Sequence, residues 1–543
     1  MEQFPETATA NGYPGRHRTW TDYSLEAIHR RKSDLLPLLE AAKSFDPIEL
    51  QATDSTSLKL FRRNLEEDIS GSRFPSEYLA LTQMGGIAQE VPQTLQMMPG
   101  FKPEDFDDII ARLNGVSNVV QQTIALLQKG AEAGVTPPQI TLREVPLQIR
   151  SQTTEDPWKS PLLSRFEALP DFLRATDKES LRQRALDAYQ TNAVPAYRDL
   201  YQFVAARYLP AARTSIGMSE LPNGREWYAF NIRKMTTTAL TAEEIHRIGM
   251  SEVKRLRGEM ETLIATTGFK GDFAQFSHFL RSDPRFFYDN PADLLQGYRD
   301  ISKRIDPELM KLFGHLPRLP YGVIPVPEYS ERAQTTAYYE PGTLTGGRPG
   351  YFYANTYNLK ARPKWEMEAL TLHEAVPGHH LQISLGQELD LPDFRRNGGY
   401  TAFVEGWGLY SESLGDEIGL YRDPYSKFGQ LTYEMWRAIR LVIDTGMHSM
   451  GWSRDDAIKF FRDNSSKTDH DLLVEVDRYI AWPGQALAYK IGQLEIRDLR
   501  RRAEQKLGKR FDVRKFHDAI LGSGALPLDL LEKQMDEWLA AQH

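Results

Sequence analysis

The stretch Thr371-Leu-His-Glu-Ala-Val-Pro-Gly-His-His-Leu-Gln382 is the part of the sequence on which the interpretation of the whole chain depends. It places three of the 12 histidines, and the acidic residue Glu374, close together. Histidine is the commonest metal ligand among side chains, and a glutamate beside a bound metal can act as a general base. The stretch therefore indicates a metal site.

The spacing of the histidines departs from the zinc-binding helix motif H-E-x-x-H, in which the second histidine follows one helical turn after the first. Here His379 and His380 follow His373 by six and seven residues. Seven residues span about 10.5 Å of an ideal helix, which is too far for chelation of one ion. Because Pro377 and Gly378 interrupt regular helical hydrogen bonding, a bulge that absorbs two residues would return His379 to the ligand position.

A zinc site also needs a third protein ligand and an open position for water. Glu405 is the best candidate, because it lies in an apolar segment where a lone carboxylate is costly to bury without a partner. Glu412 and Asp416 are alternatives further along the same segment. Two acids that precede the motif could orient the ligand imidazoles: Glu366 and Glu368.

The composition excludes several classes of protein. A net charge of −8 argues against a nucleic-acid-binding protein, whose surface is usually basic. The absence of cysteine excludes disulfides, iron–sulfur clusters and cysteine nucleophiles. No stretch has the roughly 18 continuous apolar residues of a membrane span. The N-terminus lacks the pattern of a signal peptide, but a leader removed beforehand would leave the same sequence. We therefore expect a soluble protein that is cytoplasmic, or periplasmic or secreted.

The pattern of apolar residues predicts a mainly α-helical protein with a small sheet. The clearest helix covers Pro103–Gly130, where apolar residues recur every three or four positions. Residues 321–356 favour strands, and their prolines predict edge strands beside the active site. We expect an N-terminal helical subdomain over 1–215 and a catalytic helical subdomain over 216–543. The second would contain the sheet and the metal motif, residues 373–405.

Three motifs together resemble the DUF885 family: His373–Gln382, Glu405–Tyr410 and Trp482–Gly492. Shorter matching pieces are Leu221–Gly224, Thr241–Gly249, Tyr351–Asn355, Arg440–His448 and Glu475–Tyr479. The resemblance covers about residues 216–500, and the N-terminal half more loosely. That family is grouped with the gluzincin metallopeptidases, which implies a large helical fold with a deep cleft, as in thimet-oligopeptidase-like and carboxypeptidase-Taq-like enzymes. The motif H-E-x-x-x-G-H of dipeptidyl-peptidase III-like enzymes favours His379 over His380 as the ligand.

These features predict a hydrolase that contains one zinc ion per chain and cleaves peptide or other amide bonds of short substrates. Glu374 is the expected general base. Tyr489, Tyr479 and His448 are candidates to stabilise the oxyanion. Substrate contacts are expected from residues in the matching motifs: Arg348, Tyr351, Arg478, Tyr479 and Lys490. One of the three cations in this set could hold a C-terminal carboxylate, which would make the enzyme a carboxypeptidase or dipeptidase.

Two other interpretations remain open. A carboxylate-bridged di-iron enzyme needs paired Glu-x-x-His motifs on bundle helices, and Glu26-x-x-His29 and Glu243-x-x-His246 fit that pattern formally. A helical binding protein without a metal could keep a relic of the site. The sequence does not indicate the oligomeric state.

Overall fold

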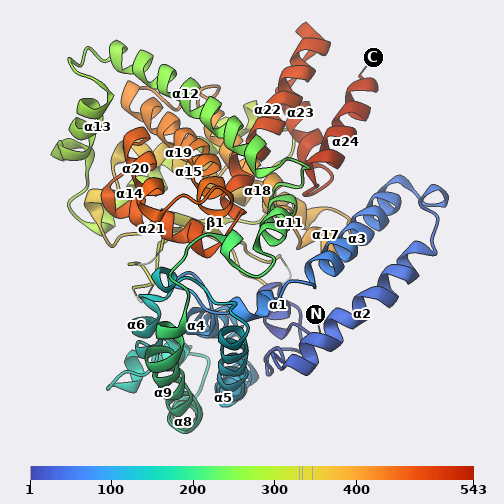
Figure 1. Cartoon of the computed structure of the whole chain (residues 1–543), viewed down its shortest axis with the longest axis vertical. Coiled ribbons are helices and arrows are strands. Elements are labelled where there is room, and N and C mark those ends of the chain that lie inside the picture. The colour runs from blue at the N-terminus through green and yellow to red at the C-terminus, as the bar shows by residue number, and fades with distance from the viewer. Residues whose placement is uncertain (1, 329, 333, 345, 543) are drawn as a thin grey trace. The chain divides into compact units, whose positions relative to one another are not determined.

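The computed structural model describes residues 2–328, 330–332, 334–344 and 346–542, and it confirms the prediction of a mainly helical protein (Figure 1). The chain forms two compact units, Met1–Ser215 and Ile216–His543. Within the described ranges, the strands of the sheet all belong to the second unit. The metal motif of the sequence also lies in the second unit.

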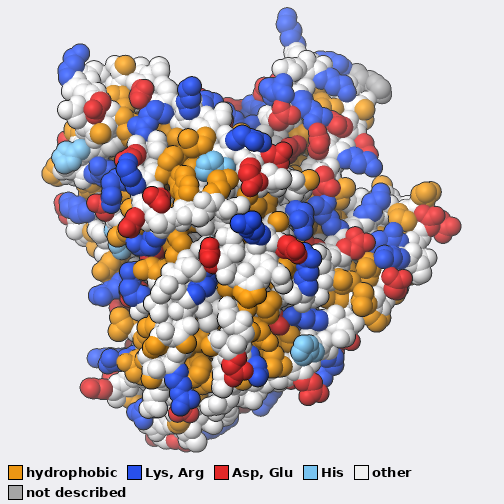
Figure 2. Space-filling view, viewed as in Figure 1, with side chains coloured by type: hydrophobic (Ala, Val, Ile, Leu, Met, Phe, Trp, Pro, Cys, Tyr) orange, Lys and Arg blue, Asp and Glu red, His pale blue; other side chains and the backbone are white. Residues whose placement is uncertain are grey.

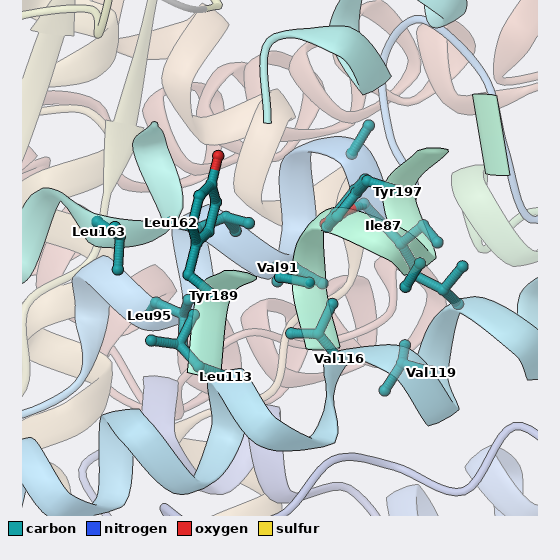
Figure 3. Packing of buried hydrophobic residues seen from close by; sticks show 14 of the residues in the cluster. Ile87, Val91, Leu95, Leu113, Val116, Val119, Leu162, Leu163, Tyr189 and Tyr197 are labelled. Carbon is teal, nitrogen blue, oxygen red and sulfur yellow. The ribbon is translucent and has the colours of Figure 1, made fainter. Parts of the chain in front are cut away.

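The first unit is built around α5, which extends over Pro103–Glu132 and has Pro103 in its first turn, as predicted. Its apolar residues pack against α4, against Tyr189 in the segment that joins α8 to α9, and against Tyr197 in α9 (Figure 3). The helices of this unit are α1 (Pro5–Ala10), α2 (Leu25–Lys43), α3 (Ala52–Gly71), α4 (Ile87–Met97), α5, α6 (Val145–Arg150), α7 (Ser164–Glu167), α8 (Ala175–Ala188), α9 (Val194–Phe203) and α10 (Leu209–Ala211).

The second unit is built around α19, in which every side chain from Phe428 to His448 is buried. Helix α12 packs along α19, and α18 packs along α22. The helices of this unit are α11 (Gly224–Thr236), α12 (Ala242–Thr266), α13 (Phe273–Ser282), α14 (Pro291–Ile305), α15 (Met367–Glu374), α16 (His379–Glu388), α17 (Asp393–Arg396), α18 (Thr401–Ser413), α19 (Pro424–Ser449), α20 (Arg454–Asn464), α21 (Asp469–Ala481), α22 (Ala488–Leu507), α23 (Val513–Leu521) and α24 (Leu528–Ala540).

The predicted sheet has three strands: β1 (Tyr321–Pro325), β2 (Ala337–Glu340) and β3 (Gly350–Ala354). Their order is β1-β3-β2, with β1 parallel and β2 antiparallel to β3. The prediction that all strands lie at edges was wrong for β3, which is central. The reason is that Pro349 lies before β3 rather than within it, so the prolines restrict only its neighbours.

Two glycines allow α18 and α22 to approach closely. A Cβ atom on Gly492 would lie 1.8 Å from the carbonyl oxygen of Ala402, and one on Gly406 would lie 2.5 Å from the Cα atom of Gly492. Both distances are far shorter than any van der Waals contact, so only glycine fits at these positions. This contact fixes α18, and hence Glu405, beside the rest of the unit.

The surface shows no segregation of charge on the face drawn in Figure 2, where basic and acidic side chains are intermixed. On this face no separate basic patch of the kind usual in nucleic-acid-binding proteins is seen. Among the described helices, none combines the length and apolar composition that crossing a membrane requires.

We predict that Gly492→Ala lowers the free energy of unfolding by about 1–3 kcal/mol, because the added methyl group must push α18 and α22 apart. Gly386→Ala in α16 is the control, since its Cβ would meet no atom within 4 Å. Alanine is the better helix former, so the control is expected to be neutral or slightly stabilising. Urea denaturation of both variants measures the difference. Equal stability of the two variants would contradict the proposed contact.

Candidate metal centre

The structure brings His373, His379 and Glu405 together, with their nearest ligand atoms within 4.8 Å of one another. The Oε2 atom of Glu405 lies 3.5 Å from Nε2 of His373 and 3.3 Å from Nε2 of His379. Zinc–ligand bonds of 2.0–2.2 Å in tetrahedral geometry place neighbouring ligand atoms about 3.3–3.6 Å apart. The measured spacings therefore fit a single zinc ion. In the described part of the chain this is the one such group of His, Asp or Glu.

The two histidines lie on different helices rather than on one bulged helix. Helix α15 ends at Glu374 and α16 begins at His379, with four residues between them that include a cis Val376–Pro377 peptide bond. A Cβ on Gly378 would lie 1.9 Å from the carbonyl oxygen of His373, so the break requires glycine. The predicted bulge was thus wrong in form. The break still returns the ring of His379 to the ring of His373, with centroids 4.7 Å apart.

Helix α18 supplies more than the ligand Glu405. A Cβ on Gly408 would lie 2.9–3.1 Å from three ring atoms of His373, so this glycine makes room for the imidazole. The indole Nε1–H of Trp407 donates a hydrogen bond of 2.8 Å to the carbonyl oxygen of Pro377 in the break. One turn of α18 therefore supplies the candidate ligand Glu405, makes room for the ring of His373, and binds the break that leads to His379.

Glu412 orients His373 instead of serving as an alternative ligand. It is fully buried, and its Oε1 lies 2.8 Å from Nδ1 of His373, the ring nitrogen opposite the one that faces Glu405. Such a carboxylate–histidine contact fixes the tautomer and the orientation of a metal ligand. Arg437 lies 3.3 Å from the same Glu412 oxygen.

The other acids considered for the site lie elsewhere. Asp416 forms an ion pair with Lys427. Glu366 and Glu368, predicted to orient the imidazoles, form ion pairs with Lys467 and Arg304 instead. That prediction was wrong, because the carboxylates are used by Lys467 in the connection between α20 and α21 and by Arg304 of α14.

The electrostatic environment favours a positive charge among the three ligands. Burial lowers the pKa of His373, but hydrogen bonds to Glu405 and Glu412 outweigh burial and raise this pKa to about 9. Burial raises the pKa of the Glu405 carboxyl, but the two histidines outweigh it and hold this pKa well below its usual value. Glu405 is thus ionised at neutral pH, which is the form that binds a metal.

His380 faces away from the metal centre. Its Nδ1 lies 2.9 Å from the hydroxyl oxygen of Tyr339 and 3.3 Å from Oγ of Ser384. Burial lowers the pKa of His380 to about 4, so the ring is neutral. The structure therefore places His379, and not His380, beside Glu405. His380 instead connects α16 to strand β2 of the sheet.

Glu374, the predicted general base, is a buried carboxylate. It follows the ligand His373 directly, at the end of α15, and it is 7% exposed. Within the described ranges its carboxylate has neither a hydrogen bond nor an ion pair. A buried carboxylate that the protein leaves without a partner is available for a water molecule or a substrate.

Tyr489, a predicted oxyanion-stabilising residue, lies beside His373. Its ring is nearly parallel to the imidazole of His373, with centroids 6.3 Å apart. Its hydroxyl oxygen accepts hydrogen bonds from Arg478 at 3.0 Å and from Gln485 at 3.4 Å. Because the oxygen is used as an acceptor, its proton is left for donation.

The structure does not support catalytic or substrate contacts for His448 and Tyr479. Nδ1 of His448 accepts from the backbone N–H of Met218, and its Nε2 lies 3.0 Å from the carbonyl oxygen of Tyr479. The Tyr479 hydroxyl, which is buried, accepts from Trp436 and Arg440, each at 2.8 Å. These side chains join helices, which corrects the roles that the sequence predicted.

Lys490 is also unavailable to substrate. Its buried Nζ lies 2.7 Å from Glu434, 2.7 Å from Gln493 and 2.9 Å from Glu252. An ammonium group has three N–H donors, and these acceptors use all of them. The predicted substrate contact was therefore wrong.

Arg348 and Tyr351 belong to the sheet rather than to the metal centre. Arg348 forms an ion pair with Glu340, the last residue of β2. Tyr351 lies in β3, where its half-buried ring packs edge-on against Tyr353 at 6.1 Å. The ion pair and the ring contact therefore place both side chains at the sheet.

The Glu-x-x-His pairs of the di-iron interpretation do not form a metal site in the described residues. Glu26 and His29 are exposed on α2. Glu243 and His246 are on α12, where Glu243 is exposed and the imidazole of His246 lies 2.9 Å from Oγ1 of Thr445. The two pairs belong to different units of the chain.

The family model described as "Bacterial protein of unknown function (DUF885)" matches residues 5–535. The chain belongs to the DUF885 family. The family suggested by the sequence motifs is therefore confirmed, and the match extends through the N-terminal half. The comparison with curated proteins gives no match.

Two solved structures are similar to this DUF885 protein over nearly the full length. One is the crystal structure of a "putative lipoprotein" from Colwellia psychrerythraea, with 28% sequence identity, a TM-score of 0.94, and coverage of 100% of this chain and 97% of the other. The second is a "putative lipoprotein of unknown function" from Shewanella oneidensis, with 18% identity, a TM-score of 0.73, and coverage of 98% and 96%. The second likeness concerns the fold alone.

We predict that Glu412→Gln lowers zinc affinity by about 10–100-fold, because the charge that orients His373 is lost. Glu417→Gln is the matched control: it lies just after α18 and forms an ion pair with Arg500, away from the ligands. Competition with a chromophoric chelator measures the affinity, and near-ultraviolet circular dichroism checks the fold. Unchanged affinity in folded Glu412→Gln protein would contradict the role given to Glu412.

Proposed function

We propose that this DUF885 protein is a zinc-dependent hydrolase that cleaves peptide or other amide bonds of short substrates. The observation that carries the proposal is the convergence of His373, His379 and Glu405, in which Oε2 of Glu405 lies 3.5 and 3.3 Å from the two imidazole nitrogens. The buried carboxylate of Glu374 follows His373 directly in the chain. Two imidazoles and one carboxylate are a ligand set that catalytic zinc sites use, with the fourth position open to water.

One zinc ion in this site would supply Lewis acidity, which lowers the pKa of a bound water and polarises an amide carbonyl. The residues of the chain would do the rest. Glu374 would accept a proton from the attacking water and later deliver it to the leaving amine. Glu412 would keep Nε2 of His373 directed at the metal. The hydroxyl of Tyr489 would donate to the developing oxyanion.

The resemblance to gluzincin metallopeptidases supports the proposal, and it implies a metallopeptidase fold with a deep cleft. The sheet β1–β3 is attached to α16 through the contact between Tyr339 and His380, one residue from the ligand His379. Short substrates would bind between the sheet and the metal centre. The similar protein from Colwellia psychrerythraea is described as a putative lipoprotein, which favours a secreted or envelope location for this chain as well.

We predict that Glu374→Gln keeps one zinc per chain but lowers the rate of peptide hydrolysis by about 10²–10⁴-fold, because the proton acceptor is lost. His373→Ala should lose both zinc and activity. Glu388→Gln is the control, since this glutamate forms an ion pair with Arg318 at the far end of α16. Elemental analysis and digestion of a peptide library measure the two properties.

The outcomes separate the competing functions. Full activity of Glu374→Gln would refute the general-base assignment. Two iron atoms per chain in the purified protein would favour the di-iron interpretation, and a folded protein that binds no metal would favour the relic site.

A further inference from the structure

Three arginine side chains surround the ring of Tyr489 beside the metal centre. The guanidinium carbon of Arg440 lies 4.4 Å from the ring centroid, and those of Arg437 and Arg478 each lie 5.9 Å from it. The imidazole of His373 also lies against this ring, with centroids 6.3 Å apart. We refer to the three arginines as the arginine cluster. They come from α19 and α21, so the packing of these helices concentrates positive charge next to the ligands.

The arginine cluster carries more positive charge than its ion pairs neutralise. Arg440 and Arg478 share the carboxylate of Glu475, at 3.1 and 3.3 Å. Arg437 lies 3.3 Å from Glu412, whose carboxylate is already bonded to a ligand imidazole. Burying a charge is costly unless it is paired and hydrogen-bonded. A bound anion would complete the pairing.

Two N–H donors of the cluster lack acceptors. Nε of Arg437 and Nη1 of Arg440 are buried without a hydrogen-bond partner among the described residues, on side chains only 5% and 3% exposed. Buried polar groups nearly always have a partner, so these two donors, like the unpartnered Oε2 of Glu412 and Oε1 of Glu475, call for a water molecule or a ligand. Solvent reaches the neighbouring groups, because the side chain of Glu405 is 17% exposed and that of Arg478 is 8% exposed.

We propose that the arginine cluster binds a carboxylate group of the substrate, so that the scissile amide bond lies next to a residue with a free carboxylate. This inference rests on the proposed hydrolase function and narrows its substrates to peptides or N-acyl amino acids of that kind. Guanidinium groups recognise carboxylates through paired N–H donors. A C-terminus and an acidic side chain offer the same chemistry, and ligands of both kinds distinguish them.

The test is calorimetric titration of the zinc-loaded full-length protein carrying Glu374→Gln, which does not consume the ligand. The ligands are N-acetyl-Ala-Ala, its C-terminal amide, and N-acetyl-Ala-Asp-amide. We expect the free acid to bind at least about tenfold more tightly than the alanine amide, because charge-assisted hydrogen bonds are lost in the amide. Tight binding of the aspartyl amide would identify an acidic side chain as a source. Equal affinity for all three ligands would overturn the proposal.

Arg478→Gln is expected to weaken binding of N-acetyl-Ala-Ala by about tenfold or more while the zinc content stays at one per chain. Arg454→Gln is the matched control: it removes the ion pair to Asp477 on the same helix α21, but no part of the cluster. If Arg478→Gln fails to fold, the affinities of the Glu374→Gln protein for the free acid and for the amide still test whether a carboxylate is recognised. The wild-type protein is assayed for hydrolysis of the same ligands. Preference of the Glu374→Gln protein for the free acid, with no hydrolysis by the wild-type protein, would disprove the hydrolase function alone. Hydrolysis of acid and amide at equal rates by the wild-type protein would disprove the carboxylate site alone.

Discussion

The metal centre depends on one backbone contact, in which Gly378 lies against the last carbonyl groups of α15. Only glycine fits there, because a Cβ atom would collide with the carbonyl oxygen of His373. This close approach lets the chain end α15 and begin α16 after four residues. That turn redirects His379 toward His373, and Trp407 holds it in place from α18. Glu405 and Gly408 then follow from the same helix α18, because its turn brings a ligand and a space for an imidazole to one face. The steric constraint at Gly378 thus brings the two histidines together, and the contact of Gly406 with Gly492 positions Glu405 beside them.

The central helix α19 shows how buried polar side chains of the second unit are stabilised. Its buried side chains include Glu434, Arg437, Arg440, Asp444 and His448. Glu434 is held ionised because Lys490, Arg497 and Arg255 outweigh burial and keep its pKa far below the usual value. Asp444 accepts hydrogen bonds from Tyr228 and from the backbone of Gly484. Glu434 and Asp444 therefore have partners, whereas Arg437 and Arg440, which lie between them on the helix, leave donors unused.

Much of the fold and the ligand set could be predicted from local patterns. Helix α5 follows from the recurrence of apolar residues, and Glu405 stands out as an acid among apolar neighbours. Glu412 follows Glu405 by two helical turns, so the sequence predicts that both lie on the same face of the helix. The sequence does not show that Glu412 contacts Nδ1 of His373 rather than the metal. The break at Gly378 could not be distinguished from a bulge, because both depend on what packs against the glycine. The roles of His448, Tyr479 and Lys490 were misjudged for a related reason: their partners are distant in sequence, and a motif does not show whether a polar side chain faces substrate or another helix.

Adjacent histidines at the start of α16 face different parts of the molecule. The ring of His379 belongs to the metal ligands, and the ring of His380 is bonded to Tyr339 in strand β2. The peptide bond between His379 and His380 therefore links strand β2 to the candidate metal ligands. A substrate that displaces β2 would move His380, the residue next to the candidate ligand His379. Binding of substrate at the sheet and the strength of metal binding would therefore be coupled through these two adjacent residues.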